Sequence, residues 1–304
     1  MEQPLVSIIM PTYNGCNLVE KSLISILNQT YTHLEVFIID DNGLGTEQQI
    51  ETEKVIIKYL SNKRVNYICH EVNKNGSAAR NTGIKICHGK YICFLDDDDV
   101  FDPQKIEKQV LMFENDFDEE IGMIYTGVKE IGKATIISHP IPTDNFMRDY
   151  LMTKIVACSS SIMIRKKVID VIGLWDESFK RHQDMEFVVR ISSKFKVSFI
   201  DEPLVIKYRE DRNFPFQSNK LNEYRRYYLK KMTPFICTFN KRTQRKIMFY
   251  NLLQIGKGYL KDKKFCLAFK IMIESKRPLK MFFYYVKDFI KYKKRYSGEK
   301  NREI

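Results

Sequence analysis

Residues 6–103 alternate short apolar runs with helical patterns, and this alternation restricts the fold more than any other feature of the chain. Apolar runs of strand length occur at 6–10, 34–39, 65–69 and 91–95, and helical patterns fill the intervals. Alternation of strands and helices with short connections predicts a parallel sheet with helices on both faces. The loops that follow the strands then meet at one edge of the sheet, where open α/β sheets bind their ligands.

The fourth apolar run ends in four consecutive carboxylates, Asp96 to Asp99. Adjacent carboxylates repel one another, so a fold that crowds them normally supplies a counter-charge, often a divalent cation. Asp102 and Pro103 are typical of the N-cap and first position of a following helix. The order of strand, acidic loop and helix favours a metal or phosphate site at the sheet edge. A solvated acidic turn is the alternative explanation.

The pattern changes after residue 103. Strand patterns recur near 121–128, 158–164, 197–200 and 204–208, and a helical pattern covers 184–193. From about residue 219 the chain is helical, aromatic and basic. We therefore expect one domain over residues 1–215, built from the halves 1–103 and 104–215, and a helical extension over 216–304.

The formal charge of +12 is concentrated in the C-terminal extension. Residues 241–304 contain 19 Lys and Arg and 5 Asp and Glu, a net charge of +14, whereas residues 1–240 have a net charge of −2. Aromatic residues such as Phe282, Phe283, Phe289 and Tyr292 interleave with these cations, which favours contact with an anionic membrane surface. A solvated helical hairpin is the alternative. No nucleic-acid-binding module accompanies the charge, so we predict no nucleic-acid partner.

The sequence also indicates the cellular compartment in which the protein resides. Met1-Glu-Gln-Pro4 lacks the charged region of a signal peptide, and no window of about 18 apolar residues indicates a transmembrane helix. The seven cysteines contain no C-x-x-C pair and are typical of reduced thiols. We expect a cytoplasmic protein that can attach to the inner face of the cell membrane.

Five short segments, in this order along the chain, resemble the family 2 glycosyltransferases, which have the GT-A fold. They are Val6-Ser-Ile-Ile-Met-Pro-Thr-Tyr-Asn14, Ile39-Asp-Asp-Asn-Gly43, Asn75-Gly-Ser-Ala-Ala-Arg-Asn81, Phe94-Leu-Asp-Asp-Asp-Asp99 and Gln183-Asp184. No single segment is decisive, but five in order and with the right spacing are specific. The resemblance covers about residues 5–210 and leaves the extension outside.

The resemblance implies a nucleotide-sugar pocket in the first half of the domain. The residues that it assigns to this pocket are Pro11, Thr12, Tyr13, Asn14, Asp40, Gly76, Arg80 and Asp97. Asp40 would accept a hydrogen bond from the base, commonly uracil, and Asp97 would lie near the ribose or diphosphate. Two alternatives stay open, because Asp40 could cap a turn and Arg80 could form an ordinary surface ion pair.

The resemblance further implies a metal site and a catalytic base. Asp96 and Asp98 match the family's D-x-D motif, which holds Mn²⁺ or Mg²⁺, with Asp98 as the direct ligand. Asp184 matches the catalytic base that deprotonates the acceptor hydroxyl. Two departures affect these assignments: the middle residue of the motif is Asp97, and Gln183 stands where the family usually has Glu.

We therefore predict an α/β protein with the GT-A fold, a mostly parallel sheet and a basic helical extension. The function that follows is a metal-assisted, inverting transfer of sugar from a nucleotide sugar, commonly a UDP-sugar. The acceptor is a hydroxyl of a surface glycan or of a lipid-linked sugar. The alternatives are transfer to a polyprenyl phosphate, and a non-catalytic protein that binds nucleotide sugars or metal.

Overall fold

The computed structural model describes residues 3–132, 134–209 and 217–297, and the side chains of 288–297 lie outside its description. The chain divides into two compact units. Unit 1 comprises Met1–Tyr150 with Lys154–Phe214, and unit 2 comprises Leu151–Thr153 with Pro215–Ile304. Unit 1 contains a nine-stranded mixed sheet, and the described part of unit 2 is helical.

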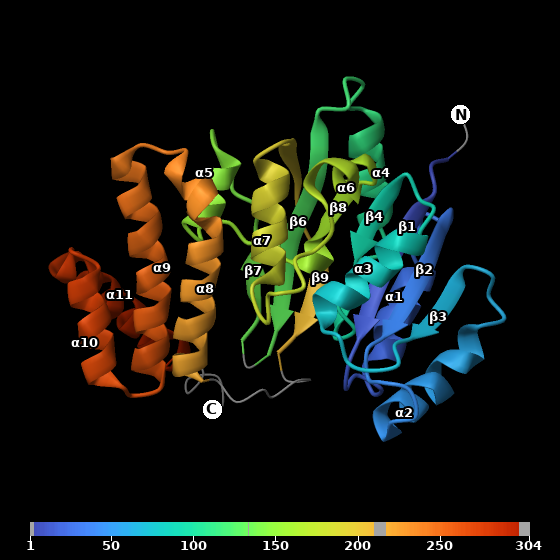
Figure 1. Ribbon diagram of the computed structural model, residues 1–304, viewed down its shortest axis with the longest axis horizontal. Helices are drawn as coiled ribbons and strands as arrows, with labels where there is room; N and C mark the ends of the chain where they lie inside the picture. The colour runs from blue at the N-terminus through green and yellow to red at the C-terminus, as the bar shows by residue number, and fades with distance from the viewer. Residues whose placement is uncertain (1–2, 133, 210–216, 298–304) are drawn as a thin grey trace. The chain divides into compact units, whose positions relative to one another are not determined.

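The first half of unit 1 has the predicted alternation of strands and helices, and Figure 1 shows its four parallel strands side by side. Their order in the sheet is β3-β2-β1-β4. The elements are β1 (Val6–Thr12), α1 (Val19–Leu27), β2 (Leu34–Asp40), α2 (Glu47–Ile56), β3 (Val65–Cys69), α3 (Gly76–Ile86) and β4 (Tyr91–Phe94). The predicted parallel sheet is therefore confirmed in this half.

The second half extends the sheet with antiparallel and parallel pairs in the order β4-β8-β6-β9-β5. Its strands are β5 (Asp99–Phe101), β6 (Ile121–Ile131), β7 (Ile136–Ser138), β8 (Ile162–Arg165) and β9 (Lys196–Tyr208). Its helices are α4 (Lys105–Glu114), α5 (Phe146–Leu151), α6 (Lys167–Ile172) and α7 (Gln183–Ser192).

Three local predictions in this half differ from the structure. The two strands predicted at 197–200 and 204–208 form the single strand β9, which shifts register against β6 between Thr126 and Val128. The segment 158–164 begins as a turn of 3₁₀-helix, Ser159–Ser161, before β8. Helix α4 starts at Lys105 because the Asp102 carboxylate accepts the N–H of Gln104 (3.0 Å) and closes a turn first.

The period-2 alternation of β1 divides its side chains between two faces. Val6, Ile8 and Met10 pack in one buried cluster with residues of α1 and α4. Ile9 points to the other face, toward Gly83 of α3. A Cβ atom at residue 83 would lie 2.5 Å from Cγ2 of Ile9, so glycine is what lets α3 approach the sheet this closely.

Replacing Gly83 by Ala should therefore destabilise unit 1 although Ala favours helices. We expect the free energy of unfolding to fall by about 1–3 kcal/mol, because the methyl group forces Ile9 or the helix to shift within a packed core. The measurement is urea unfolding followed by circular dichroism. Lys85→Ala, on the exposed side of the same helix, is the matched control and should change stability by less than about 0.5 kcal/mol. Unchanged stability of Gly83→Ala would contradict the close packing.

Unit 2 contains the helices α8 (Ser218–Cys237), α9 (Lys241–Lys261), α10 (Phe265–Glu274) and α11 (Pro278–Ser297). A buried cluster that includes Phe249, Leu252, Ile271 and Met281 joins α9, α10 and α11. In the described part of the chain, no helix combines the length and the apolar character needed to cross a membrane. The helical extension predicted from the sequence is thus present.

Candidate active site

Hydrogen bonds join the loops that follow the parallel strands. The Thr12 hydroxyl donates to Asp97 Oδ2 (2.6 Å) and links the end of β1 to the loop after β4. The Asn14 N–H donates to Asn42 Oδ1 (2.8 Å) and links the loops after β1 and β2. Asp41 accepts two backbone N–H groups (both 2.8 Å) from the turn before α3. The predicted meeting of these loops at one edge is therefore observed.

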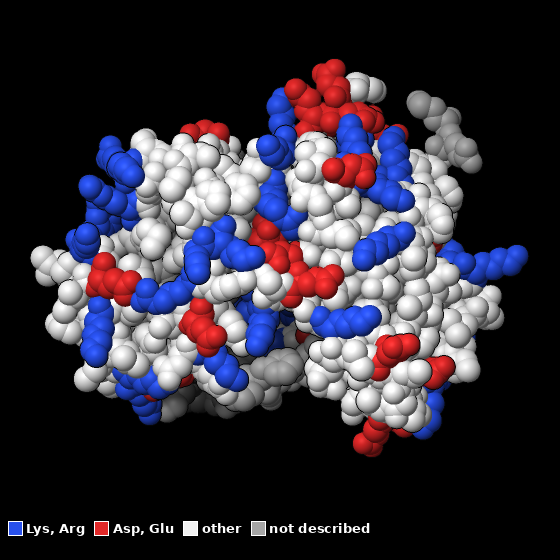
Figure 2. Space-filling view, in the orientation of Figure 1, with Lys and Arg blue, Asp and Glu red and all other residues white. Residues whose placement is uncertain are grey.

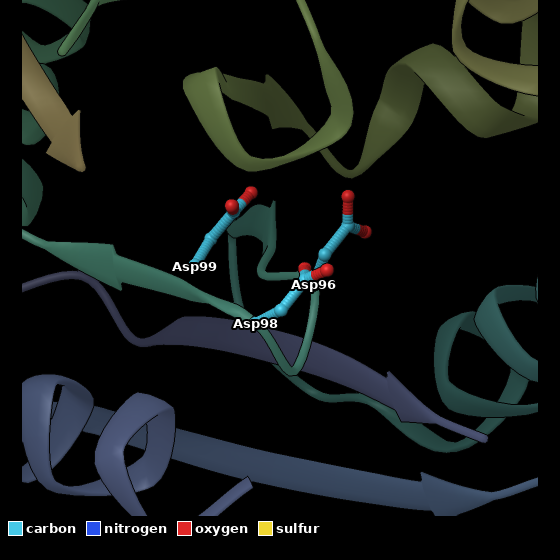
Figure 3. Close-up of side chains that lie close together, drawn as sticks. All are labelled: Asp96, Asp98 and Asp99. Atoms are coloured by element: carbon cyan, nitrogen blue, oxygen red, sulfur yellow. The ribbon is translucent and has the colours of Figure 1, made fainter. Parts of the chain in front are cut away.

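Three carboxylates of the acidic loop form a cluster at this edge. Asp96, Asp98 and Asp99 can each offer an oxygen such that all three oxygens lie within 4.8 Å of one another. Figure 3 shows the three side chains pointing to the same side of the loop between β4 and β5. The predicted pair Asp96 and Asp98 is thus brought together, and Asp99 joins it. Carboxylate oxygens are the ligands that Mg²⁺ and Mn²⁺ prefer.

Asp96 is surrounded by compensating groups. Arg80 Nη2 donates to its Oδ1 (2.5 Å), the Ser159 hydroxyl lies 2.9 Å from its Oδ2, and Lys207 Nζ lies 3.9 Å from Oδ2. Burial by itself would raise the pKa of the Asp96 carboxyl, but the cations Arg80 and Lys207 and the bond from Ser159 outweigh burial and lower this pKa. Asp96 is therefore held as an anion.

The other three members of the acidic run have different surroundings. Asp97 accepts the Thr12 hydroxyl and the Tyr13 N–H at the end of β1, and it is not one of the three clustered carboxylates. Asp99 accepts bonds from the Ser160 hydroxyl and from Lys207 Nζ, both at 2.5 Å. Burial raises the pKa of Asp99 to about 7, despite the opposing charge of Lys207. Asp99 is thus engaged by protein groups and buried, and Asp98, like Asp96, is partly buried.

The two acids at the end of β2, Asp40 and Asp41, differ in their position relative to the site. Asp40 is fully buried, and its oxygens accept bonds from the Tyr67 hydroxyl (2.7 Å) and the Asn42 N–H (2.9 Å). Burial raises the pKa of Asp40, more than these bonds lower it. Asp41 lines the cavity described below, and His70 Nδ1 lies 2.7 Å from its Oδ1. The base-binding role predicted for Asp40 stays a prediction.

Asp184 lies in the first turn of α7, where the helix dipole stabilises an anion. Burial, however, raises the pKa of Asp184, and the negative charge of Asp96 raises it further, although Arg80 and Lys207 oppose both effects. Asp184 is therefore a stronger base than an exposed aspartate.

A cavity of about 220 Å³ opens at this edge of the sheet. It is lined by Pro11, Thr12, Tyr13, Asp41, Gly76, Arg80, Asp96, Asp97, Asp98 and Gln183. Of the predicted site residues, Asn14, Asp40 and Asp184 are not among the lining residues. Gln183, the residue before Asp184, accepts a bond from Arg80 Nη1 (3.2 Å), so the start of α7 reaches the cavity.

The sequence reasoning missed Lys207, Ser159 and Asp41 as members of the site. Lys207 stands at the end of β9, and Ser159 in the 3₁₀ turn before β8. Neither belongs to a motif. Asp41 was visible as the second of two adjacent acids at the end of β2, but the sequence did not show which of the two lines the cavity.

Comparison with known proteins identifies the class. A family model described as Glycosyl transferase family 2 matches residues 7–173, and the chain belongs to this family. The uncharacterized glycosyltransferase MJ1057 of Methanocaldococcus jannaschii is 30% identical over 265 residues, which cover 83% of this chain and 88% of that relative. The protein is therefore a glycosyltransferase, and the predicted enzyme class is confirmed. The non-catalytic alternative is set aside.

Two further proteins extend the comparison. WfgD of Escherichia coli, named a UDP-Glc:alpha-D-GlcNAc-diphosphoundecaprenol beta-1,3-glucosyltransferase, is 26% identical over 230 residues, covering 75% of this chain and 85% of WfgD. The solved mannosyltransferase PcManGT of Pyrobaculum calidifontis, in complex with GDP-Man and Mn²⁺, has a TM-score of 0.61 at 13% identity and covers 90% of this chain and 75% of its own. This structural likeness confirms the predicted GT-A fold.

Proposed function

We propose that the enzyme transfers a sugar from a UDP-sugar to a hydroxyl of a surface-glycan or lipid-linked acceptor, with inversion and with help from a divalent cation. The observation that carries this proposal is the carboxylate cluster at the edge of the cavity, with Asp184 at the start of the neighbouring helix. We further propose that residues 241–304 bring the enzyme to an anionic membrane surface, where a lipid-linked acceptor would reside.

Arg80 is suited to the diphosphate of the donor. Its side chain is 9% exposed, lines the cavity and stacks over Trp175, with the guanidinium carbon 4.8 Å from the ring centroid. Its Nε–H has no hydrogen-bond partner among the described residues. A buried donor without a partner is costly, and a phosphate oxygen would satisfy it. We therefore assign Arg80 to the diphosphate.

The carboxylate cluster fits a divalent cation. Asp96 and Asp98 both line the cavity, and their oxygens match the preference of Mn²⁺ and Mg²⁺ for oxygen ligands. A cation bound there would neutralise the diphosphate as it leaves. Lys207 and Ser159 would hold Asp96 in place beside it. Mn²⁺ in PcManGT supports a cation in a protein of the same fold.

Asp184 supplies the remaining requirement, which is a base for the acceptor hydroxyl. Inversion needs attack from the side opposite the leaving diphosphate, and the attacking hydroxyl must lose its proton. One ionised carboxylate at the acceptor side suffices for this step and typically contributes about 10²–10⁴-fold to the rate. The raised pKa of Asp184 favours its role as proton acceptor.

The donor and acceptor classes rest on the relatives. The name of WfgD specifies a UDP-sugar donor and a lipid-diphosphate-linked sugar acceptor, and this relative matches three quarters of the chain. Asp96, Asp98 and Arg80 recognise features that every nucleotide sugar shares, so these residues do not select the base. The choice of UDP therefore depends on the relatives and on the resemblance.

The test is a panel of nucleotide sugars that includes UDP-Glc, UDP-GlcNAc and GDP-Man, each with Mn²⁺. Binding is measured by calorimetry, and slow donor hydrolysis is measured by release of the nucleoside diphosphate. We expect a UDP-sugar to bind most tightly and to be hydrolysed. A preference for GDP-Man would contradict the proposed donor, and failure of every nucleotide sugar would contradict the proposed reaction.

A further inference from the structure

Helix α11 has an exposed apolar stripe along its first half. Leu279, Phe282, Phe283 and Val286 are 84, 57, 69 and 39% exposed. Their spacing of three and four residues places them on one face of the helix. Exposed aromatic side chains in such an arrangement indicate a surface that binds a partner.

The opposite face of α11 is already occupied within unit 2. Met281 is fully buried in the cluster with Phe249 and Ile255 of α9, and Tyr284 and Tyr285 pack against the same cluster. The helix is thus anchored by one side, and the apolar stripe is not needed for that packing. The preceding helix, α10, also exposes Phe265, Phe269 and Ile273.

Cations accompany the apolar stripe. Residues 265–287 contain five Lys or Arg side chains, and all five are exposed. They are Lys270, Lys276, Arg277, Lys280 and Lys287. Glu274, the single acid in this range, pairs with Arg226 of α8 (2.6 Å). Figure 2 shows several Lys and Arg side chains over the helices at the left of the view.

We propose that the exposed stripe of α11 inserts into the interfacial region of an anionic lipid bilayer. Phenylalanine and leucine side chains enter the boundary between headgroups and acyl chains, and the neighbouring cations contact the anionic headgroups. This combination favours a bilayer over an apolar protein groove, because an apolar groove would not need the neighbouring exposed cations. The inference narrows the proposed membrane contact of residues 241–304 to one helix face and does not depend on the donor sugar or on Asp184.

The experiment measures sedimentation of the full-length protein with vesicles of phosphatidylglycerol and phosphatidylcholine. We expect the wild type to bind these vesicles and to bind pure phosphatidylcholine weakly. The double variant Phe282→Ser/Phe283→Ser should lower the partition coefficient about tenfold or more, because burial of two aromatic side chains is lost. Both residues are exposed, so we expect the variant to fold, which thermal unfolding would verify.

The matched control is Leu111→Ser/Phe117→Ser, which removes two apolar side chains that are 61 and 89% exposed in unit 1. It should bind vesicles as the wild type does. Lys276→Gln/Arg277→Gln should weaken binding at low salt and have little effect at high salt, where electrostatic attraction is screened.

Three outcomes of the vesicle experiment would overturn the proposal. They are no binding of the wild type to anionic vesicles, unchanged binding of Phe282→Ser/Phe283→Ser, and an equal loss of binding in the control Leu111→Ser/Phe117→Ser. Light scattering that shows a wild-type dimer, dissociated by Phe282→Ser/Phe283→Ser, would assign the stripe to a second copy of the chain instead. UDP-sugar hydrolysis without a membrane, measured on the same variants, separates failure of this proposal from failure of the proposed function.

Discussion

Asp98→Asn is expected to lower sugar transfer about 10²-fold or more, because metal assistance to a leaving diphosphate is worth several kcal/mol. The substitution keeps the shape of the side chain and removes its charge. Asp98 lines the cavity, and the family resemblance assigns it as the direct cation ligand. Loss of the Asp98 charge should therefore weaken cation binding directly.

The measurement for Asp98→Asn is twofold. Calorimetric titration with Mn²⁺ should show an affinity at least about tenfold weaker, since removing even an outer-shell partner commonly costs 10–100-fold. Transfer assays with increasing Mn²⁺ should then show whether the lost activity follows the lost affinity. Asp118→Asn, an exposed acid in the loop after α4, is the control and should change neither quantity. Full wild-type activity in excess EDTA would contradict a metal role.

The sequence was most informative where a local pattern determines the structure. The apolar runs of 6–10, 34–39 and 65–69 became the parallel strands β1, β2 and β3, because period and flanking turns specify buried strands. The meeting of their loops followed from topology alone. The roles of Thr12, Arg80, Asp96 and Asp98 followed from the family resemblance, which assigns specific residues of these loops and of α3 to the site.

The sequence was least informative about contacts between distant segments. Lys207 reaches Asp99, 108 positions away, and Ser159 reaches Asp96, 63 positions away. A lysine near a strand end and a serine in a turn are ordinary residues, so nothing local marks them. Their importance comes from the pairing of β5 with β9 and from the turn before β8, which are tertiary features.

The adjacent acids Asp40 and Asp41 show a different limit. Successive residues at a strand end point to different sides, and a shift of one position would exchange the two acids. Both acids are buried, but Asp40 accepts the Tyr67 hydroxyl, whereas Asp41 lines the cavity. A motif specifies that an acid is needed at this place, whereas the side-chain direction depends on the register of β2.

Asp184→Asn is expected to lower kcat about 10²-fold or more while the donor affinity stays within a few-fold, because the lost function is general-base catalysis. The amide keeps the size of the side chain and cannot accept the proton of the acceptor. The donor contacts proposed for Asp96, Asp98 and Arg80 are untouched. Asp170→Asn, an exposed acid in the first turn of α6, is the matched control and should leave kcat unchanged.

The pH dependence tests the same role of Asp184 independently. Only the ionised carboxylate can accept a proton, so wild-type kcat should fall as the pH drops through the pKa of Asp184. Burial raises this pKa above the ordinary value of 3.8, so the fall should begin at a higher pH than an exposed aspartate would give. In Asp184→Asn the residual kcat should no longer show this fall at acidic pH. In Asp170→Asn the fall should remain as in the wild type.

A near-normal kcat of Asp184→Asn would change the mechanism rather than the fold. The acceptor would then not need a protein base, which is the property of a phosphate acceptor, since a phosphate is already ionised at neutral pH. The polyprenyl-phosphate alternative would become the better explanation. Because cation binding and donor binding do not involve deprotonation of the acceptor, the Mn²⁺ titration and the donor titration should remain unchanged in either case. The comparison of kcat with donor affinity in this one variant therefore separates the two acceptor classes.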